Sequence, residues 1–223
     1  MEAFFSNVHI TSFMSKKNTA IVVIVLALLI DQISKIYIKT HFTIGEELTV
    51  FSDWFIIHFT ENNGMAWGFE FGGKSGKLFL TLFRLVAISG IVYWLYDTIK
   101  KNAPTPVIVA ISLIFAGAVG NIIDSVFYGV IFDSSAHKVA TLFSEHPYGE
   151  IFYGKVVDML YFPMWEGTLP NWIPFVGGDH FTFFNAIFNG ADSFITIGVL
   201  LLFIFSKQAF PKEEKATTIS ESI

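Results

Sequence analysis

The chain has 223 residues, a length that suits one domain, and it is strongly apolar. Hydrophobic residues make up 53% of it and charged residues only 15%, whereas a soluble domain carries roughly 25% charged residues. Much of its surface is therefore expected to face lipid. The formal net charge of −5 comes from loops and tails, and no basic stripe indicates nucleic-acid binding. The absence of cysteine excludes disulfides, thiol nucleophiles and thiolate metal sites.

Four apolar segments each approach the ~20 residues that a helix needs to cross a bilayer. They are residues 19–39, 78–98, 106 to about 127, and 182–205. Pro104 and Pro106 stand where the third helix should begin, a position that proline favours. The sequence therefore predicts an all-α membrane protein built as a four-transmembrane-helix bundle.

The lysines set the orientation of these helices, because cytoplasmic loops carry an excess of Lys and Arg. Lysines flank the predicted helices at three places, which four spans put on one side: Lys16, Lys17, Lys100, Lys101, Lys207, Lys212 and Lys215. Residues 1–18 are then a cytoplasmic extension, residues 19–206 the membrane domain and residues 207–223 a cytoplasmic tail. Residues 40–77 and 128–181 lie outside. Lys74 and Lys77 are exceptions, because they fall on the outer side.

The outer segments differ in pattern. Residues 49–59 are rich in β-branched and aromatic residues and lie between Gly45 and the Asn-Asn-Gly of residues 62–64, which predicts short strands on the outer membrane surface. Residues 128–181 have no long periodic run and are expected to form an extramembrane loop insertion. The fold expected is thus the helix bundle with a small extracytoplasmic β-rich cradle and a loop insertion on the outer, periplasmic side.

Polar residues of different predicted helices fall at one depth. At 1.5 Å per residue, Asp31, Asn121, Asp124 and Asp192 lie ~21, ~26, ~30 and ~22 Å from the cytoplasmic end, and Arg84 lies ~10 Å below the outer surface. All five fall in the outer third of a core ~30 Å thick, or at its edge. Ionisable residues inside spans are costly and mark functional sites, so this layer is the expected site.

Simpler explanations exist for several of these residues. Asp31 and Lys35 are spaced i, i+4 and could pair on one helix face. Asp158 could be an ordinary loop aspartate, and Arg84 could lie against lipid and extend its guanidinium to the headgroups. Asp192 has no basic neighbour in sequence, so we expect it to need a partner group from elsewhere.

Common hydrolytic motifs are absent from the sequence. The six histidines form no H-E-x-x-H or similar metal-binding cluster, and there is no G-x-S-x-G. Paired carboxylates are the remaining hydrolytic chemistry, and we expect no metal and no cofactor.

Five short blocks, in order, resemble those of the lipoprotein signal peptidases, also called signal peptidase II. DQISK at residues 31–35 is similar to the family's D-x-x-S-K, and NNGMAW at 62–67 to N-x-G-x-A-aromatic. GNIID at 120–124 is similar to G-N-x-x-D, VVD at 156–158 to V-V-D, and FNGADS at 188–193 to F-N-x-A-D-S. Each block is weak alone, but five in order on four spans carry the resemblance.

The resemblance implies an aspartic endopeptidase of the bacterial cytoplasmic (inner) membrane, with its active site at the outer face. Its substrates are diacylglyceryl-modified prolipoproteins, cleaved just before the lipidated cysteine; membrane lipids surround it, and a monomer is expected. The catalytic pair is Asp158 and Asp192. The residues expected to shape the pocket or contact substrate are Asn62, Gly64, Asn121, Asp124 and Asn189. Asp31 and Lys35 are expected to support the first helix.

Two features depart from the family pattern. Ser125 stands where the family usually has an arginine, and Arg84, the only arginine in the chain, is at a suitable depth to substitute for it. In addition, 33 residues separate Asp124 from Asp158, a much longer spacing than usual.

Two other classes of function compete with the peptidase. A small ion-coupled transporter or channel also carries intramembrane charges, but it needs them along the whole depth of the membrane rather than in one layer. A non-catalytic scaffold could bind a partner through residues 128–181.

Overall fold

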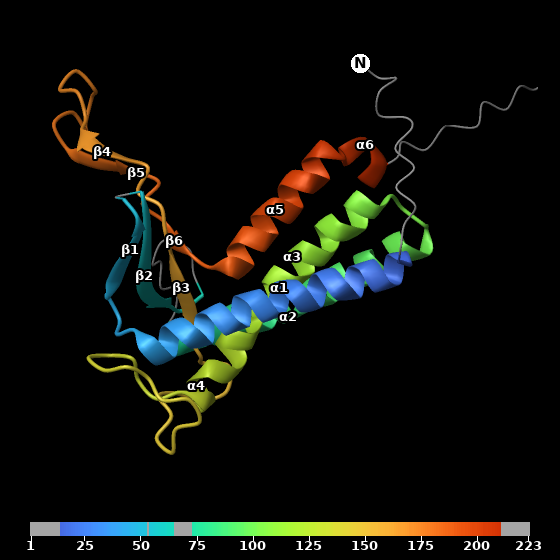
Figure 1. Cartoon of the computed structure of the whole chain (residues 1–223), viewed down its shortest axis with the longest axis horizontal. Helices are drawn as coiled ribbons and strands as arrows, with labels where there is room; N and C mark the ends of the chain where they lie inside the picture. Colours follow the sequence, from blue (N-terminus) through green and yellow to red (C-terminus); the bar gives the residue numbers. More distant parts are fainter. Residues whose placement is uncertain (1–13, 53, 65–72, 211–223) are drawn as a thin grey trace, which may run out of the picture.

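Three long apolar helices dominate the computed structural model, which describes residues 14–52, 54–64 and 73–210 (Figure 1). Helices α1 (Lys16–His41) and α2 (Gly73–Lys100) are each unbroken. Helix α3 (Thr105–Ile123) runs through a π-helical turn, η3 (Asp124–Tyr128), into α4 (Gly129–Ile131). All three stretches are long and apolar enough to cross a membrane. The sequence prediction of long apolar helices in these three regions is therefore confirmed.

Local capping explains where two of these helices begin. Helix α1 starts three residues before the predicted position, because the Ser15 hydroxyl accepts a hydrogen bond from the Asn18 backbone N–H at 3.2 Å. Helix α3 starts directly after Pro104, as its two prolines predict.

The fourth apolar helix begins later than the sequence predicts, at Gly190 instead of residue 182. Residues 182–188 are not helical: they contain the end of strand β5 (His180–Phe183) and strand β6 (Ile187–Phe188). Helix α5 (Gly190–Ile204) starts only after Asn189 and is followed by the short α6 (Ser206–Ala209). The aromatic run before Asn189 consists of two short strands joined by a turn, and hydropathy alone does not distinguish such strands from helix.

Helix α3 lies among the other helices, and small residues allow α5 to approach it closely. A Cβ atom on Gly198 of α5 would lie 2.6 Å from the backbone oxygen of Ala110. A Cβ atom on Gly117 of α3 would lie 2.3 Å from the backbone oxygen of Ala191. Such small residues are typical of helix contacts in membranes. They bring the start of α5 against the end of α3, where the polar residues gather.

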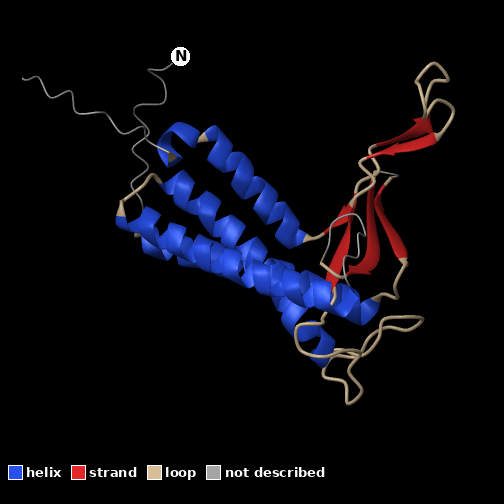
Figure 2. Ribbon diagram, turned by 180° about the vertical axis from the view of Figure 1, so that it is seen from behind, coloured by secondary structure: helices blue, strands red, loops and turns tan. Residues whose placement is uncertain are grey.

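A four-stranded antiparallel sheet stands at one end of the helices (Figure 2). Its order is β1-β2-β3-β6. The strands not yet bounded are β1 (Glu47–Phe51), β2 (Phe55–Asn62) and β3 (Val156–Tyr161). The strands predicted around residues 49–59 are present, and residues 65–70 lie outside the described part of the chain.

Residues 128–181 are not the plain loop that the sequence predicts. They begin in helix, include β3 at the centre of the sheet, and contribute strand β4 (Trp165–Thr168), which pairs with β5 in a separate hairpin. The strands are short and interrupted by turns, so no long periodic pattern marks them.

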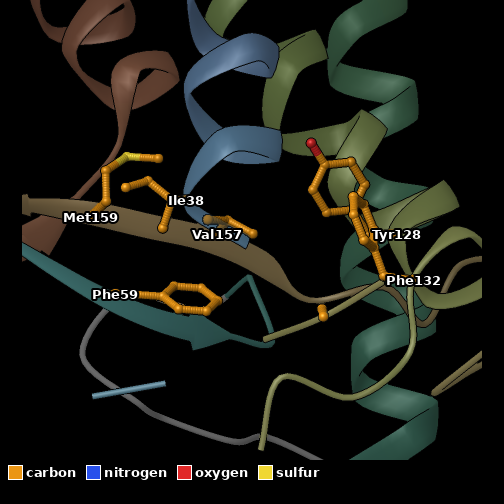
Figure 3. Close-up of a cluster of buried hydrophobic side chains, with 7 residues drawn as sticks. Ile38, Phe59, Tyr128, Phe132, Val157 and Met159 are labelled. Carbon is orange, nitrogen blue, oxygen red and sulfur yellow. The ribbon is translucent and has the colours of Figure 1, made fainter. Parts of the chain in front are cut away.

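A buried apolar cluster packs the sheet against α1 and against η3, the helical turn that follows α3. Ile38, Phe59, Tyr128, Val157 and Met159 all belong to it (Figure 3).

A buried ion pair reinforces the same junction. Lys39 of α1 contacts Glu61 of β2 and donates to the Ser135 hydroxyl at 2.8 Å. The inserted segment after α4 is thereby attached to both α1 and β2.

The lysine-bearing ends of the helices lie opposite the sheet. In Figure 1 the start of α1, the connection between α2 and α3, and α6 all lie at the far end from β1, β2 and β3. This arrangement agrees with the lysine distribution, which puts these three connections on one side.

Candidate active site

The two aspartates of the predicted catalytic pair line a single cavity of about 550 Å³. Asp158 comes from the centre of β3, and Asp192 from the first turn of α5. The other residues that line the cavity are Thr60, Glu61, Asn62, Gly64, Arg84, Asn121, Val156, Asn185, Ala186, Ile187 and Phe188. Residues 34 positions apart in sequence thus meet where the sheet joins the helices.

Strand pairing positions Asp158. Asn62 pairs with Val156 across β2 and β3, so Asn62 and Asp158 are diagonal neighbours on one face. The Asn62 amide donates to Oδ2 of Asp158, and the Asn189 amide donates to Oδ1 at 2.7 Å. The side chain is nearly buried, with 5% of the residue exposed. Both carboxylate oxygens are therefore fixed by side-chain amides.

The pKa of Asp158 is raised from its usual value to about 7. Burial is the larger cause, because it disfavours the charged form, and the nearby charge of Asp192 adds to it. The hydrogen bonds from Asn189 and Asn62 act in the opposite direction. The protonated form of this carboxyl is therefore favoured at a higher pH than for an exposed aspartate.

Asp192 is held by the start of its own helix. The Asn189 side chain accepts from the Asp192 backbone N–H at 3.0 Å, and Asp192 Oδ2 accepts from the Asn189 backbone N–H at 3.3 Å. This reciprocal pair is a capping box. Asp192 Oδ1 accepts from the Asn121 amide at 2.9 Å. Asp192 thus has the partner group that its sequence context predicts: the Asn121 amide donates to it. Its position in the first turn of α5 also favours its negative charge, because a helix N-terminus stabilises anions.

Asn189 and Asn121 connect the two aspartates. Asn189 is fully buried, and its amide lies 3.1 Å from Oδ1 of Asn121 as well as contacting Asp158. The chain Asp158–Asn189–Asn121–Asp192 therefore holds both carboxylates through two amide side chains.

A buried ion cluster lies beneath this network. The Lys35 ammonium lies 3.0 Å from Asp31, 2.8 Å from Asp124 and 2.9 Å from Oδ1 of Asn121. Asp31 also accepts from the backbone N–H of Ala191 at 2.8 Å. The i, i+4 pairing of Asp31 and Lys35 is present, and it extends to α3 and to the first turn of α5.

Asp124 belongs to this cluster rather than to the cavity lining. Besides Lys35, it accepts from the Gln32 amide at 3.1 Å and from the backbone N–H of Val157 at 3.4 Å. Its contacts therefore tie α1 and β3 to the end of α3. The sequence allows both a pairing role near a helix end and a pocket role for Asp124, and the structure shows the pairing.

Arg84 points toward the cavity, not toward lipid. Its guanidinium donates to the backbone oxygen of Gly64 and interacts electrostatically with Asp192. Gly64 has a positive φ of 86°, and a Cβ there would lie 2.8 Å from Arg84 Nη1. Gly64 therefore leaves room for the guanidinium.

Ser125 lies elsewhere. It is 2% exposed, and its hydroxyl donates to the backbone oxygen of Asn121 within its own helix at 2.9 Å. Ser125 and Arg84 do not share a position in the described structure.

Sequence reasoning missed the role of Asn189 as a helix cap and the cavity residues Thr60, Glu61 and Asn185. The spacing N-x-x-D at residues 189–192 is itself a capping signal that could have identified the true start of α5. Within residues 14–52, 54–64 and 73–210, no group of three His, Asp or Glu side chains is arranged to hold a metal ion.

The chain is similar to known proteins along most of its length. A family model described as signal peptidase (SPase) II matches residues 23–207. The lipoprotein signal peptidase of Porphyromonas gingivalis is 50% identical over 183 residues, which cover 81% of this chain and 79% of that protein. That of Amoebophilus asiaticus is 34% identical over 206 residues, covering 88% and 82%.

A solved bacterial membrane enzyme has a similar structure. It aligns with a TM-score of 0.56 at 29% identity and covers 89% of this chain and 94% of its own. Sequence blocks, cavity and overall structure thus agree, and the chain belongs to the signal peptidase II family.

Proposed function

We propose that this chain is an aspartic endopeptidase that removes signal peptides from diacylglyceryl-modified prolipoproteins, cutting just before the lipidated cysteine. The observation that carries the proposal is the cavity lined by both Asp158 and Asp192 in a member of this peptidase family. The transporter alternative has no support from the family or from the relatives.

The catalytic chemistry requires two nearby carboxyls that share a proton. Asp158 is the member whose buried position favours the protonated form near neutral pH. It donates to the scissile carbonyl oxygen and stabilises the developing oxyanion. Asp192 accepts a proton from the attacking water. The two exchange roles as the leaving amine is protonated, so the pair titrates as a unit.

The surrounding groups position the substrate and the catalytic pair. Asn62, Asn121 and Asn189 hold the carboxylates through their amides. Arg84 and Gly64 also line the cavity, where the guanidinium, held by the Gly64 backbone oxygen, can donate to the substrate main chain.

A supporting role falls to the buried ion cluster. Asp31, Lys35 and Asp124 hold three helices and β3 in register around the cavity. They act on the geometry of the cavity and not on the substrate itself.

The proposed membrane arrangement has four crossings. Helix α5 alone is ~22 Å long, shorter than the ~30 Å hydrocarbon core. It ends at a turn at Phe205, after which the chain bends into the short α6 (Figure 1). The proposed fourth crossing therefore includes residues that flank α5.

In this arrangement the protein is a monomer of the cytoplasmic membrane, with residues 1–18 and 207–223 cytoplasmic and the catalytic cavity at the outer face. Single cysteines can test this, because the chain has none of its own. A cysteine replacing Lys207 should react with impermeant maleimide only after permeabilisation, and one replacing Lys138 should react in intact cells. The opposite pattern would overturn the topology.

The activity itself can be tested with the purified full chain and a lipidated precursor. We expect a product whose new N-terminal residue is the diacylglyceryl cysteine, identified by mass. A precursor with Cys→Ser at that position cannot be lipidated and should not be cut. Cleavage of both precursors at equal rates would contradict the proposed substrate class.

A further inference from the structure

A second cavity, of about 520 Å³, lies beside the catalytic one and has no role in the peptidase chemistry. It forms between the start of α2 and the inserted segment after α4. Its lining residues are Asn63, Gly73, Lys74, Lys77, Pro147, Tyr148, Gly149, Glu150, Tyr153 and Lys155. Asn63 follows the catalytic-site residue Asn62, so the two cavities are neighbours at the end of β2.

The charge of this cavity is positive. Three lysines and one glutamate line it, although the chain as a whole has a formal charge of −5. Lys74 and Lys77 are the lysines that do not fit the expected excess of basic residues on the cytoplasmic side. A ligand on the outer side would account for their position.

Lys74 and Lys155 retain hydrogen-bonding capacity for such a ligand. Lys74 lies 3.7 Å from Glu150, and Lys155 lies 3.7 Å from Glu61. Both separations are longer than the ~2.7–2.9 Å of a charge-assisted hydrogen bond, and an ammonium has three donors. Lys77 is nearly buried and donates to the Asn63 side chain at 3.1 Å, which joins two segments of the cavity lining.

The surroundings favour an amphiphile over a free anion. Helix α2 continues from the cavity with exposed apolar side chains, among them Phe79 (72% exposed), Leu82 (47%) and Phe83 (60%). The ring of Tyr153 lies 5.6 Å from the Lys74 ammonium. The cavity therefore lies at the end of a helix whose other face is apolar and exposed, and in the proposed topology phospholipid headgroups surround this end.

We infer that this cavity binds the phosphate of an anionic phospholipid of the outer leaflet. The inference rests on the proposed topology, which puts the start of α2 at that surface. A lipid held there connects the inserted segment to the membrane next to the catalytic cavity.

Native mass spectrometry of the full chain, released from vesicles into detergent without any substrate, tests this. The probes are phosphatidylglycerol and diacylglycerol with the same acyl chains, and only the first has a phosphate. The wild type should retain phosphatidylglycerol in preference to diacylglycerol. Lys74→Gln with Lys155→Gln should lower that retention about fivefold for each lysine removed.

A matched control removes two lysines at the opposite end of the helices, Lys100→Gln with Lys101→Gln, and should retain lipid as the wild type does. Lys74 and Lys155 are partly exposed, with 79% and 42% of their side chains accessible, so their replacement should leave the melting temperature unchanged. An equal loss of lipid in both double variants would overturn the site.

Two further measurements distinguish the phospholipid from other anionic ligands of the cavity. If inorganic phosphate at millimolar concentration displaces the lipid, the cavity is a small-anion site and the inference fails. If a glutamate-rich peptide binds the wild type in a lysine-dependent manner while lipid retention does not depend on Lys74 and Lys155, the cavity binds an acidic peptide instead. Because retention is measured without cleavage, failure of the lipid site is distinguishable from failure of the peptidase assignment.

Discussion

Asn189 offers a test of how the cavity is built, because one side chain has two separate functions. Its oxygen caps α5 by accepting from the Asp192 backbone N–H, and its amide donates to Asp158. Asn189→Ser retains a capping oxygen but is too short to reach Asp158, whereas Asn189→Ala loses both functions. The cap is worth ~1 kcal/mol, so the alanine variant should be less stable than the serine variant by about that amount.

The pH dependence of the serine variant follows from the pKa of Asp158. The hydrogen bond from Asn189 favours the charged carboxylate and so lowers this pKa, which burial raises to about 7. Its removal must raise the pKa further. A hydrogen bond to a charged group is worth ~1.5–3 kcal/mol, water in the cavity replaces part of it, and one pKa unit is ~1.4 kcal/mol. A shift of about one unit follows.

Catalysis needs one proton on the pair, so activity should fall as pH rises through the higher of the two apparent values. The alkaline limb of the wild-type profile should lie near pH 7 and should move about one unit higher in Asn189→Ser. The rate should also fall at least about tenfold, since Asp158 loses one of two positioning amides. The assay is kcat against pH with a lipidated precursor.

Asn171→Ser, on the exposed loop of the β4–β5 hairpin, is the matched control and should leave the profile unchanged. A limb that moves to lower pH in Asn189→Ser, or an unchanged rate, would refute the assigned hydrogen bonding.

The remaining predictions concern Arg84, Gly64 and Lys35. Arg84→Ala should lower kcat/KM with an unchanged melting temperature, and Arg84→Lys should keep only part of the wild-type kcat/KM. Adding Ser125→Arg to Arg84→Ala should not restore activity, because Ser125 is buried and bonded within its own helix. Gly64→Ala should cost ~1 kcal/mol and most of the activity, because its φ of 86° disfavours a side chain and its Cβ meets Arg84. Lys35→Met should destabilise the protein by about 3–5 kcal/mol, measured by thermal unfolding in detergent, since it leaves two buried carboxylates uncompensated.

Much of the helix arrangement could be predicted because local signals determine it. Hydropathy located three helices, and Pro104 fixed the start of α3. The common depth of Asp31, Asn121 and Asp192 also anticipated their meeting, because helix rise converts sequence position directly into depth.

Other features depend on contacts that sequence position does not reveal. Residues 182–188 are apolar both as strand and as helix, so the start of α5 was misplaced although Asn189 and Asp192 carry a capping signal. The contact of Lys39 with Glu61 and Ser135 joins three distant segments, and no local pattern indicates such a contact. The direction of Arg84 likewise depends on Gly64, which leaves space for it only in the folded chain.

The central claim is that Asp158 and Asp192 act as one catalytic pair. The most direct measurement is the single-turnover rate of lipidated-precursor cleavage by Asp158→Asn, Asp192→Asn and the double variant, each checked for folding by its melting temperature. Each single variant should lose nearly as much activity as the double, because neither carboxyl works alone. A folded single variant that cleaves at close to the wild-type rate would contradict the account.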